Sequence, residues 1–278
     1  MKRSIRVRES SPRFRVAIPA RYASTRLPGK PLRLLAGQPL LQHVYRRALA
    51  SGALEVVIAT DDSRIREVAE GFGAVVCMTA PEHPSGTDRL AEVADRRGWP
   101  DDDIIVNLQG DEPQMPAALV RQVAAALEAR PEAGIATACT RIRRLEEVFD
   151  PNVVKVVRDA LGDASYFSRA PIPWHREAFA SGGSGLTELP DDGAVYYRHI
   201  GIYAYRAAVL RRYPRLVPAP TERAESLEQL RALWHGIRIH VVEAVEAPPP
   251  GIDTEADLAR VVAELERSEQ QVEPGQFG

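Results

Sequence analysis

Short apolar segments alternate with amphipathic segments through the first half of the chain. Residues 14–19 form an apolar run closed by a proline, and this pattern predicts a buried strand. Residues 40–50 carry apolar side chains at helical spacing, which predicts an amphipathic helix. The alternation continues with strands predicted at 54–59, 74–78 and 103–108, and with helices predicted at 63–72, 88–97 and 116–129. The pattern indicates an α/β fold with a mostly parallel sheet covered on both faces.

The rhythm changes after Thr140, where strands become more frequent. Strands are predicted at 153–158, 164–167, 194–206 and 237–242, and helices at 227–234 and 255–266. A Gly- and Ser-rich stretch at 181–185 predicts a mobile loop. We therefore expect one domain over residues 14–268 with an inserted strand-rich subregion, preceded by a flexible basic extension at 1–13 and followed by a flexible tail at 269–278.

The overall charge of the chain is nearly balanced, with 36 Lys and Arg against 38 Asp and Glu. This balance argues against a protein that coats nucleic acid. The longest run without a charged residue is 34–45, which is shorter than the ~20 residues of a bilayer-spanning helix, so we expect no membrane insertion. Two cysteines, Cys77 and Cys139, cannot form a disulfide framework and fit a reducing cytoplasm.

The loop after the first predicted strand contains Arg21, Arg26 and Lys30 and no acidic residue. Arginine and lysine side chains of this kind bind phosphate oxygens. The loop is not a Walker A motif, because that pattern needs Gly at the position of Ser24 and Ser or Thr at the position of Pro31. From charge alone, a phosphate-binding loop and a solvated basic turn are equally open interpretations.

Two carboxylates follow predicted strands. Asp111 stands in the segment 109–113 and Asp253 follows the strand predicted at 237–242. Magnesium prefers one or two carboxylates combined with substrate phosphates, although a turn aspartate and a helix cap are ordinary structural alternatives. Ligands of parallel sheets bind beyond the carboxyl ends of the strands. The basic loop and segment 109–113 are therefore predicted to meet at the functional site.

The sequence Ser85-Gly86-Thr87 precedes a predicted helix. Its hydroxyl groups could cap that helix, and its backbone N–H groups could instead hold a base or a ribose. No Ser/His/Asp order and no Cys/His pair stands out, so covalent catalysis has little support.

Several polar residues of the second half are further candidates. His199 and Tyr203 alternate along a predicted strand and should lie on one face of it. A structural histidine is the alternative for His199, and a surface or ion-paired arginine is the alternative for Arg169. Glu228 and Gln229 would ordinarily form the polar face of a helix.

Taken together, these stretches resemble the 3-deoxy-manno-octulosonate (Kdo) cytidylyltransferases, also called CMP-Kdo synthetases. The matching segments are residues 18–32, 85–92, 106–113, 166–174, 198–205, 227–233 and 251–258. The resemblance implies a nucleotide-diphospho-sugar transferase-like (Rossmann-like) fold, usually in a cytoplasmic homodimer. It also implies the reaction CTP + Kdo → CMP-Kdo + pyrophosphate, which serves lipopolysaccharide biosynthesis, with Mg²⁺ as cofactor.

The resemblance assigns roles to individual residues. The residues implied for CTP are Arg21, Arg26, Lys30, Ser85, Gly86, Thr87 and Asp111. Those implied for the sugar acid are Gln109, Arg169, His199, Tyr203, Glu228 and Gln229. Asp111 and Asp253 would hold Mg²⁺, and they would form the catalytic group with Arg21 and Lys30. No residue stands out as a general base.

Three alternatives remain open at the level of sequence. The first is a cytidylyltransferase for another acidic sugar, such as a sialic acid or an amino-substituted Kdo. The second is a nicotinamide-dependent dehydrogenase, which the missing glycine fingerprint disfavours. The third is a non-catalytic nucleotide-binding module, which would not need two aspartates beside a phosphate loop. The extension before Phe14 and the polar segment 224–226 depart from the family pattern.

Overall fold

The computed structural model describes residues 12–23, 27–180, 182, 186–190, 193–252 and 254–270. Residues 1–11 of the expected basic extension and most of the expected mobile loop lie outside these ranges. Helix α9 (Glu255–Gln270) continues two residues beyond position 268, where the flexible tail was expected to begin.

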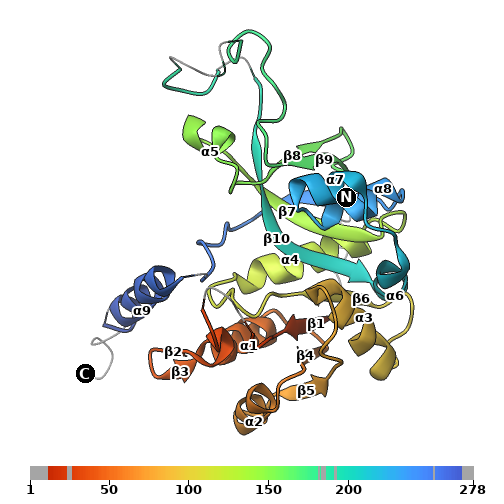
Figure 1. Ribbon diagram of the computed structural model, residues 1–278, viewed down its shortest axis with the longest axis vertical. Helices are drawn as coiled ribbons and strands as arrows, with labels where there is room; N and C mark the ends of the chain where they lie inside the picture. The colour runs from red at the N-terminus through yellow and green to blue at the C-terminus, as the bar shows by residue number, and fades with distance from the viewer. Residues whose placement is uncertain are drawn as a thin grey trace, which may run out of the picture.

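One nine-stranded sheet organises the described residues (Figure 1). Its strand order is β11-β7-β10-β6-β1-β4-β5, and β8 pairs with β10 and carries β9 on its other edge. The strands are β1 (Phe14–Pro19), β4 (Glu55–Thr60), β5 (Val75–Met78), β6 (Ile104–Asn107), β7 (Ile135–Arg141), β8 (Lys155–Arg158), β9 (Ala164–Ser168), β10 (Tyr197–Arg206) and β11 (Ile239–Glu243). β1 pairs in parallel with β4 and β6, and β7 with β11. β10 runs antiparallel between β6 and β7. The predicted mostly parallel α/β sheet is confirmed.

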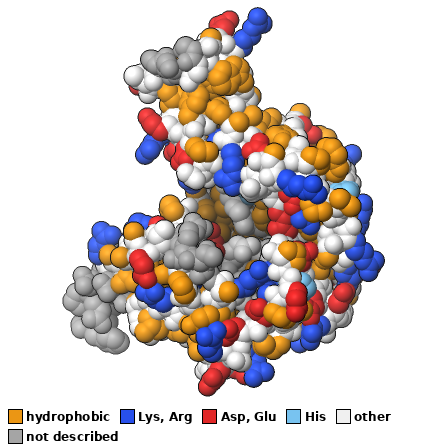
Figure 2. Space-filling view, in the orientation of Figure 1, with side chains coloured by type: hydrophobic (Ala, Val, Ile, Leu, Met, Phe, Trp, Pro, Cys, Tyr) orange, Lys and Arg blue, Asp and Glu red, His pale blue; other side chains and the backbone are white. Residues whose placement is uncertain are grey.

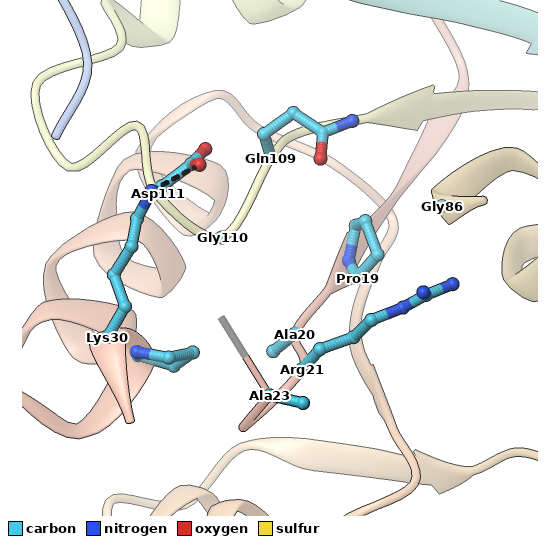
Figure 3. Close-up of a pocket in the computed structure, with 10 residues that line it drawn as sticks. Pro19, Ala20, Arg21, Ala23, Lys30, Gly86, Gln109, Gly110 and Asp111 are labelled. Atoms are coloured by element: carbon cyan, nitrogen blue, oxygen red, sulfur yellow. Dashed lines mark hydrogen bonds and ion pairs between the residues drawn. The ribbon is translucent and has the colours of Figure 1, made fainter. Parts of the chain in front are cut away.

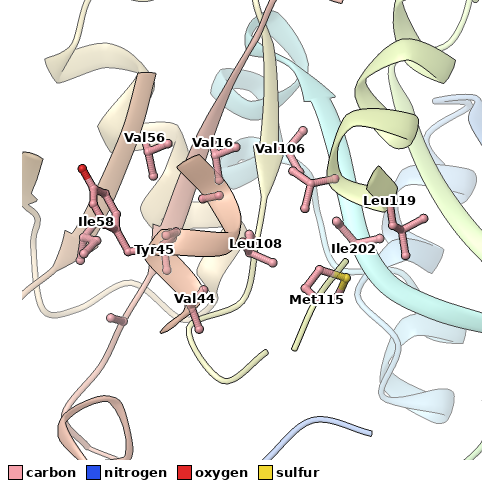
Figure 4. Close-up of a cluster of buried hydrophobic side chains, with 14 of the residues drawn as sticks. Val16, Val44, Tyr45, Val56, Ile58, Val106, Leu108, Met115, Leu119 and Ile202 are labelled. Carbon is pink, nitrogen blue, oxygen red and sulfur yellow. The ribbon is translucent and has the colours of Figure 1, made fainter. Parts of the chain in front are cut away.

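Helices cover both faces of this sheet. They are α1 (Leu40–Ala50), α2 (Ser63–Gly71), α3 (Gly86–Arg96), α4 (Ala117–Glu128), α5 (Leu145–Phe149), α6 (Ala207–Arg212), α7 (Pro220–Glu225) and α8 (Gln229–Trp234), with the short hairpin β2 (Leu34–Leu35) and β3 (Gln38–Pro39) before α1. Val16 and Ile18 of β1 pack in the core with α1 and α4 (Figure 4), whereas Ala17 packs on the other face with α3 and α6. Successive strand side chains point to opposite faces, so an unbroken apolar strand suits a sheet that is buried on both sides.

A smaller lobe extends beyond the start of β10 (Figure 1). We call residues 142–150 and 174–196, so far as they are described, the projecting lobe. It has its own cluster of buried apolar side chains, namely Ile142, Leu145, Val148, Phe179 and Tyr196. Figure 2 shows apolar side chains gathered on its surface, and Trp174 is 53% exposed there. The inserted subregion expected from sequence therefore comprises β8, β9 and this lobe.

Cys77 and Cys139 are both free and buried. Burial raises the pKa of Cys139 to about 11, so its thiol stays protonated and unreactive. Among the described residues, no helix has the length and apolar character needed to cross a bilayer.

Candidate active site

A pocket opens at the carboxyl ends of β1 and β6 (Figure 3). It is lined by Pro19, Ala20, Arg21, Ala23, Lys30, Pro31, Gly86, Gln109, Gly110 and Asp111. The basic loop and segment 109–113, which are about 80 residues apart in sequence, therefore meet as the strand-end rule predicts. Five of the ten lining residues carry no functional group and were not predicted as site residues from the sequence. They are Pro19, Ala20, Ala23, Pro31 and Gly110.

Lys30 and Asp111 form the charged part of the pocket. The Lys30 Nζ lies 2.8 Å from the Asp111 Oδ2, and the pair is drawn in Figure 3. The Lys30 side chain is 10% exposed, whereas that of Asp111 is 39% exposed. Lys30 begins a short 3₁₀ turn, η1 (Lys30–Leu32), which follows Gly29 in the left-handed region (φ 66°). The sequence Gly29-Lys30 thus turns the ammonium group toward the end of β6.

Gly110 allows the ends of β1 and β6 to come close together. A Cβ atom at this position would lie 2.8 Å from the carbonyl oxygen of Pro19, a distance that no side chain tolerates. The next residue, Asp111, accepts a hydrogen bond at its carbonyl from the N–H of Ile252 (3.2 Å). Ile252 directly precedes Asp253. Two of the predicted site residues, Asp253 and Arg26, lie outside the described residues. A glycine directly after a buried strand was the available sequence signal for this close approach.

Arg21 connects the basic loop to the start of α3. Its Nη2 donates to the carbonyl oxygens of His83 (2.5 Å) and Ser85 (3.1 Å). Figure 3 shows the side chain extending toward Gly86 and away from Lys30. The two predicted phosphate-binding cations therefore occupy opposite sides of the pocket.

The basic loop is also held from outside by α2. The Arg64 guanidinium carbon lies 3.3 Å from the centre of the Tyr22 ring. Gly29 also lies against the Tyr22 ring, because a Cβ atom at Gly29 would be 3.2 Å from it. The Gly29 N–H donates to the Tyr22 carbonyl oxygen (3.1 Å). Asp62 orients Arg64 through a 2.6 Å ion pair. We call Tyr22, Gly29 and Arg64 the loop clamp.

Ser85 caps α3, which confirms the structural interpretation of that residue. Its Oγ accepts from the N–H of Asp88 (3.2 Å) and lies 2.7 Å from the Asp88 Oδ2 and 3.0 Å from the Glu228 Oε1. Thr87 is buried and its hydroxyl is hydrogen-bonded to Glu228 and Tyr205. Residues that the family resemblance assigns to the nucleotide and to the sugar are thus directly bonded to each other. Burial raises the pKa of Glu228.

His199 and Tyr203 lie on one face of β10, as predicted, with ring centres 5.3 Å apart. The His199 Nε2 is 3.0 Å from the Thr137 Oγ, and its ring packs edge-on against Phe167. Burial lowers the pKa of His199 to about 3. The imidazole is therefore neutral at neutral pH, so it can offer a ligand a hydrogen bond but no positive charge.

The other predicted sugar-binding residues occupy different environments. Gln109 lines the pocket. Gln229 begins α8 and is buried. Arg169 is not among the pocket-lining residues; its Nε and Nη1 donate to the carbonyls of Glu225 (2.7 Å) and Pro151 (2.9 Å). The structure therefore brings Gln109 to the pocket and ties Arg169 to neighbouring backbone.

The donor set at the pocket fits a magnesium ion that is shared with phosphates. Within the described part of the chain, no three His, Cys, Asp or Glu side chains converge as an all-protein metal site. Mg²⁺ does not require such a cage, because it is commonly held by one or two carboxylates, substrate phosphates and water. The partly exposed Asp111 carboxylate at the pocket meets this requirement.

Comparison with known proteins places the chain in a family. Residues 16–239 match the family described as cytidylyltransferase. The protein from Halorhodospira halophila called 3-deoxy-manno-octulosonate cytidylyltransferase is 57% identical over 92% of this chain and 98% of its own. A protein of the same name from Marinobacter nauticus is 58% identical over 91% of this chain and 97% of its own.

A solved structure agrees with these relatives. The structure of CMP:2-keto-3-deoxy-manno-octonic acid synthetase complexed with CTP superimposes with a TM-score of 0.82 and 43% sequence identity, covering 92% of this chain and 99% of that one. The chain belongs to the cytidylyltransferase family, whose members are nucleotidyltransferases. Within this family the relatives just described are the Kdo-activating enzymes, and the resemblance drawn from sequence is thereby confirmed.

Proposed function

We propose that this enzyme transfers a cytidylyl group from CTP to Kdo, forming CMP-Kdo and pyrophosphate. The names of its relatives and the CTP complex of its structural neighbour support the two substrates. The observation that carries the proposal is the pocket at the ends of β1 and β6. It combines two cations, Arg21 and Lys30, with the Asp111 carboxylate beside the capped start of α3.

The proposed chemistry is a single displacement. The 2-hydroxyl oxygen of Kdo forms a bond to the α-phosphorus while the bond from that phosphorus to the β-phosphate oxygen breaks. Pyrophosphate leaves with the bonding electron pair, and the hydroxyl proton passes to solvent. Catalysis of such a transfer rests mainly on positioning and charge neutralisation. Lys30 and Arg21, on opposite sides of the pocket, would offset the phosphate charge from two directions.

Asp111, together with Asp253, would hold the proposed Mg²⁺. When bound, the ion supplies positive charge to the phosphate oxygens. Lys30 forms an ion pair with Asp111, and with that carboxylate holding a metal its ammonium group would be available to a phosphate oxygen. The Lys30–Asp111 ion pair would thereby be replaced by a lysine–phosphate pair and a carboxylate–metal pair.

The sugar acid would be met mainly by uncharged groups. Gln109 lines the pocket, and His199 is neutral because of burial. Tyr203 keeps its proton as well, since burial raises the pKa of its hydroxyl. We propose that these side chains orient Kdo by hydrogen bonds, and that Arg169 and Gln229 lie farther from the sugar than these side chains.

We further propose a cytoplasmic homodimer that serves lipopolysaccharide biosynthesis. Two free, buried thiols fit a reducing compartment. The exposed apolar surface of the projecting lobe, with Trp174 at 53% exposure, is a natural contact for a second copy. Light scattering of wild-type protein and Trp174→Glu tests the assembly. We expect a dimer that the substitution weakens, and a wild-type monomer would contradict the assignment.

The substrates are tested by measuring pyrophosphate release with CTP, Mg²⁺ and a panel of acidic sugars containing Kdo, amino-substituted Kdo and a sialic acid. We expect the highest kcat/KM with Kdo and little release when UTP replaces CTP. Preference for a different sugar would reassign the substrate within the same family. Absence of release with every sugar would contradict the proposed reaction.

A further inference from the structure

We propose that Glu228 carries a proton at neutral pH and donates it to Ser85, so that a hydrogen-bonded chain joins the nucleotide side of the site to the sugar side. The chain runs from Tyr205 through Thr87, Glu228 and Ser85 to Asp88. The residue roles at the two ends rest on the proposed function, whereas the protonation of Glu228 rests on the hydrogen bonds alone.

The two carboxyl groups beside the Ser85 hydroxyl require one more proton than that hydroxyl supplies. Its Oγ lies 2.7 Å from a carboxylate oxygen of Asp88 and 3.0 Å from one of Glu228. A serine hydroxyl has a single proton to donate, and the Asp88 N–H already donates to the same oxygen (3.2 Å). The hydroxyl can satisfy one carboxylate only. The second carboxyl group must therefore donate to Ser85 and must itself be protonated.

The position and distance of Asp88 assign the additional proton to Glu228 and not to Asp88. It lies in the first turn of α3, where backbone N–H groups and the helix dipole stabilise negative charge. The Ser85 hydroxyl is 0.3 Å closer to Asp88 than to Glu228, as expected for donation to the anion. Glu228 is the N-cap residue of the short helix α8, but its side chain makes no capping hydrogen bond to the backbone of that helix.

The surroundings of Glu228 act on its pKa in both directions. Burial, which has the largest effect, and Asp88 raise the pKa, whereas the hydrogen bonds with Thr87 and Ser85 and the charge of Arg231 lower it. Asp88 approaches it from α3, and Tyr203, Tyr205 and Tyr213 approach it from β10 and from the 3₁₀ turn η2 (Tyr213–Arg215). The nearby cation, Arg231, is engaged by Glu222 in a 2.5 Å ion pair. Burial raises the pKa of Glu228, and the negative charge of Asp88 acts in the same direction.

The direction of every bond in the chain then follows. In this scheme the Thr87 hydroxyl, which is hydrogen-bonded to both Tyr205 and Glu228, donates its one proton to Glu228 and accepts the proton of Tyr205. Glu228 donates to Ser85, and Ser85 donates to the Asp88 carboxylate. Each hydroxyl uses its one proton once, and the chain ends on an anion. Without the additional proton on one carboxyl group, the Ser85 hydroxyl would leave one of the two carboxylates facing another acceptor.

This arrangement matters for an anionic substrate. An ionised Glu228 would repel a sugar acid in a region of low dielectric, whereas a protonated carboxyl presents an uncharged surface. Ser85 precedes Gly86, which lines the pocket, so the chain also connects α8 to the nucleotide side. Glu228 is a positioning residue in this scheme: it holds two hydroxyls in fixed orientations and keeps this side of the site neutral.

Carbon-13 NMR with glutamate labelled at the side-chain carboxyl carbon tests the protonation directly. We expect one signal that has the shift of a protonated acid at pH 7 and that disappears in Glu228→Gln. Glu146→Gln is the control, because Glu146 is exposed and its replacement should leave that signal in place. A Glu228 signal that titrates at or below the ordinary value of about 4.3 would overturn the proposal.

Stability against pH supplies a second readout. A carboxyl whose folded pKa is raised stabilises the fold fully below the unfolded pKa of about 4.3 and loses that contribution as the pH rises through the folded pKa. The stability of Glu228→Gln relative to wild type should therefore increase from pH 4.5 upward, whereas that of Glu146→Gln stays constant. A constant difference for Glu228→Gln would overturn the proposal. Neither readout uses Kdo, so failure of the proposed reaction would leave both results standing.

Discussion

The two sides of the pocket are built from different chemistry. The first side, formed by the basic loop and the end of β6, holds the charged pair Lys30 and Asp111, and the Asp111 side chain is 39% exposed. Arg21 extends from the same loop to the opposite side, at the start of α3. On the second side Gly86 of α3 lines the pocket, and next to it in α3 and α8 lies a buried set of hydroxyl and carboxyl groups bonded to one another. This contrast indicates a division of labour. In the proposed reaction, the first side would neutralise phosphates and metal, and the second would orient uncharged parts of the ligands.

The two sides also differ in how they are supported. The α3 side rests on side chains buried within the sheet and its helices, such as Thr87 at 3% exposure. The charged side depends on local devices, which are the close approach at Gly110 and the loop clamp. Substitutions on the charged side should therefore change catalysis with little effect on folding. Those on the α3 side should also change stability.

The largest effect is expected from Asp111→Asn. Loss of this carboxylate removes the proposed metal ligand, and we expect turnover to fall by about 10²–10³-fold. CTP binding without metal should survive, because Lys30 and Arg21 remain. Pyrophosphate release and metal-free CTP titration measure the two quantities. Asp102→Asn, which removes the same charge at an exposed turn, is the matched control. Near-normal turnover in Asp111→Asn would show that Asp111 is not a metal ligand.

A smaller and selective effect is expected from His199→Ala. Loss of one neutral hydrogen bond, worth about 1 kcal/mol, should raise the KM for the sugar about five- to tenfold and leave the KM for CTP nearly constant. Because the pKa of His199 is about 3, the wild-type KM for the sugar should show no inflection from its ionisation near pH 6.5. Equal changes in both KM values would mean that His199 does not contact the sugar.

A still smaller effect is expected from Arg64→Ala, which opens the loop clamp. A cation–π contact at an exposed position is worth about 0.5–1 kcal/mol, which corresponds to a two- to fivefold rise in the KM for CTP. Hydrogen exchange of residues 20–30 should become faster. Arg66→Ala, which removes the same charge at another exposed position of α2, is the control. If both variants change the KM equally, the general charge of α2 and not the clamp is responsible.

No effect on catalysis is expected from deletion of residues 1–11. The pocket is formed by residues from position 19 onward, and the family match begins at residue 16. Initial rates of the truncated and full-length proteins should agree within about twofold. A large loss would show that the basic segment contributes to the charged side of the pocket.

Much of the fold was predictable because many of its strands are rich in valine and isoleucine. β1 and α1 have the bounds that the apolar pattern predicts. The strand β7 (Ile135–Arg141) escaped prediction, although it lies between β10 and β11. Its sequence of Ala, Thr and Cys has weak strand propensity, and its position is set by packing against neighbouring strands.

Only part of the candidate site could be predicted from the sequence. The strand-end rule identified the meeting of Lys30 and Asp111, because it requires only the order of the elements. It could not reveal that Glu228 bonds to Ser85, since the two residues are 143 positions apart and Glu228 alone resembles an ordinary polar helix residue. The neutrality of His199 likewise depends on burial, which no local pattern encodes.

The most direct test of the proposed reaction is phosphorus-31 NMR of a mixture of the enzyme, CTP, Kdo and Mg²⁺. The account predicts that CTP is replaced by one new phosphodiester signal and an equal amount of pyrophosphate, and that neither forms when Kdo is omitted. Formation of CDP with a phosphorylated sugar would mean transfer of the terminal phosphoryl group, and CMP with pyrophosphate in the absence of sugar would mean hydrolysis. Either result would contradict a cytidylyl transfer to Kdo.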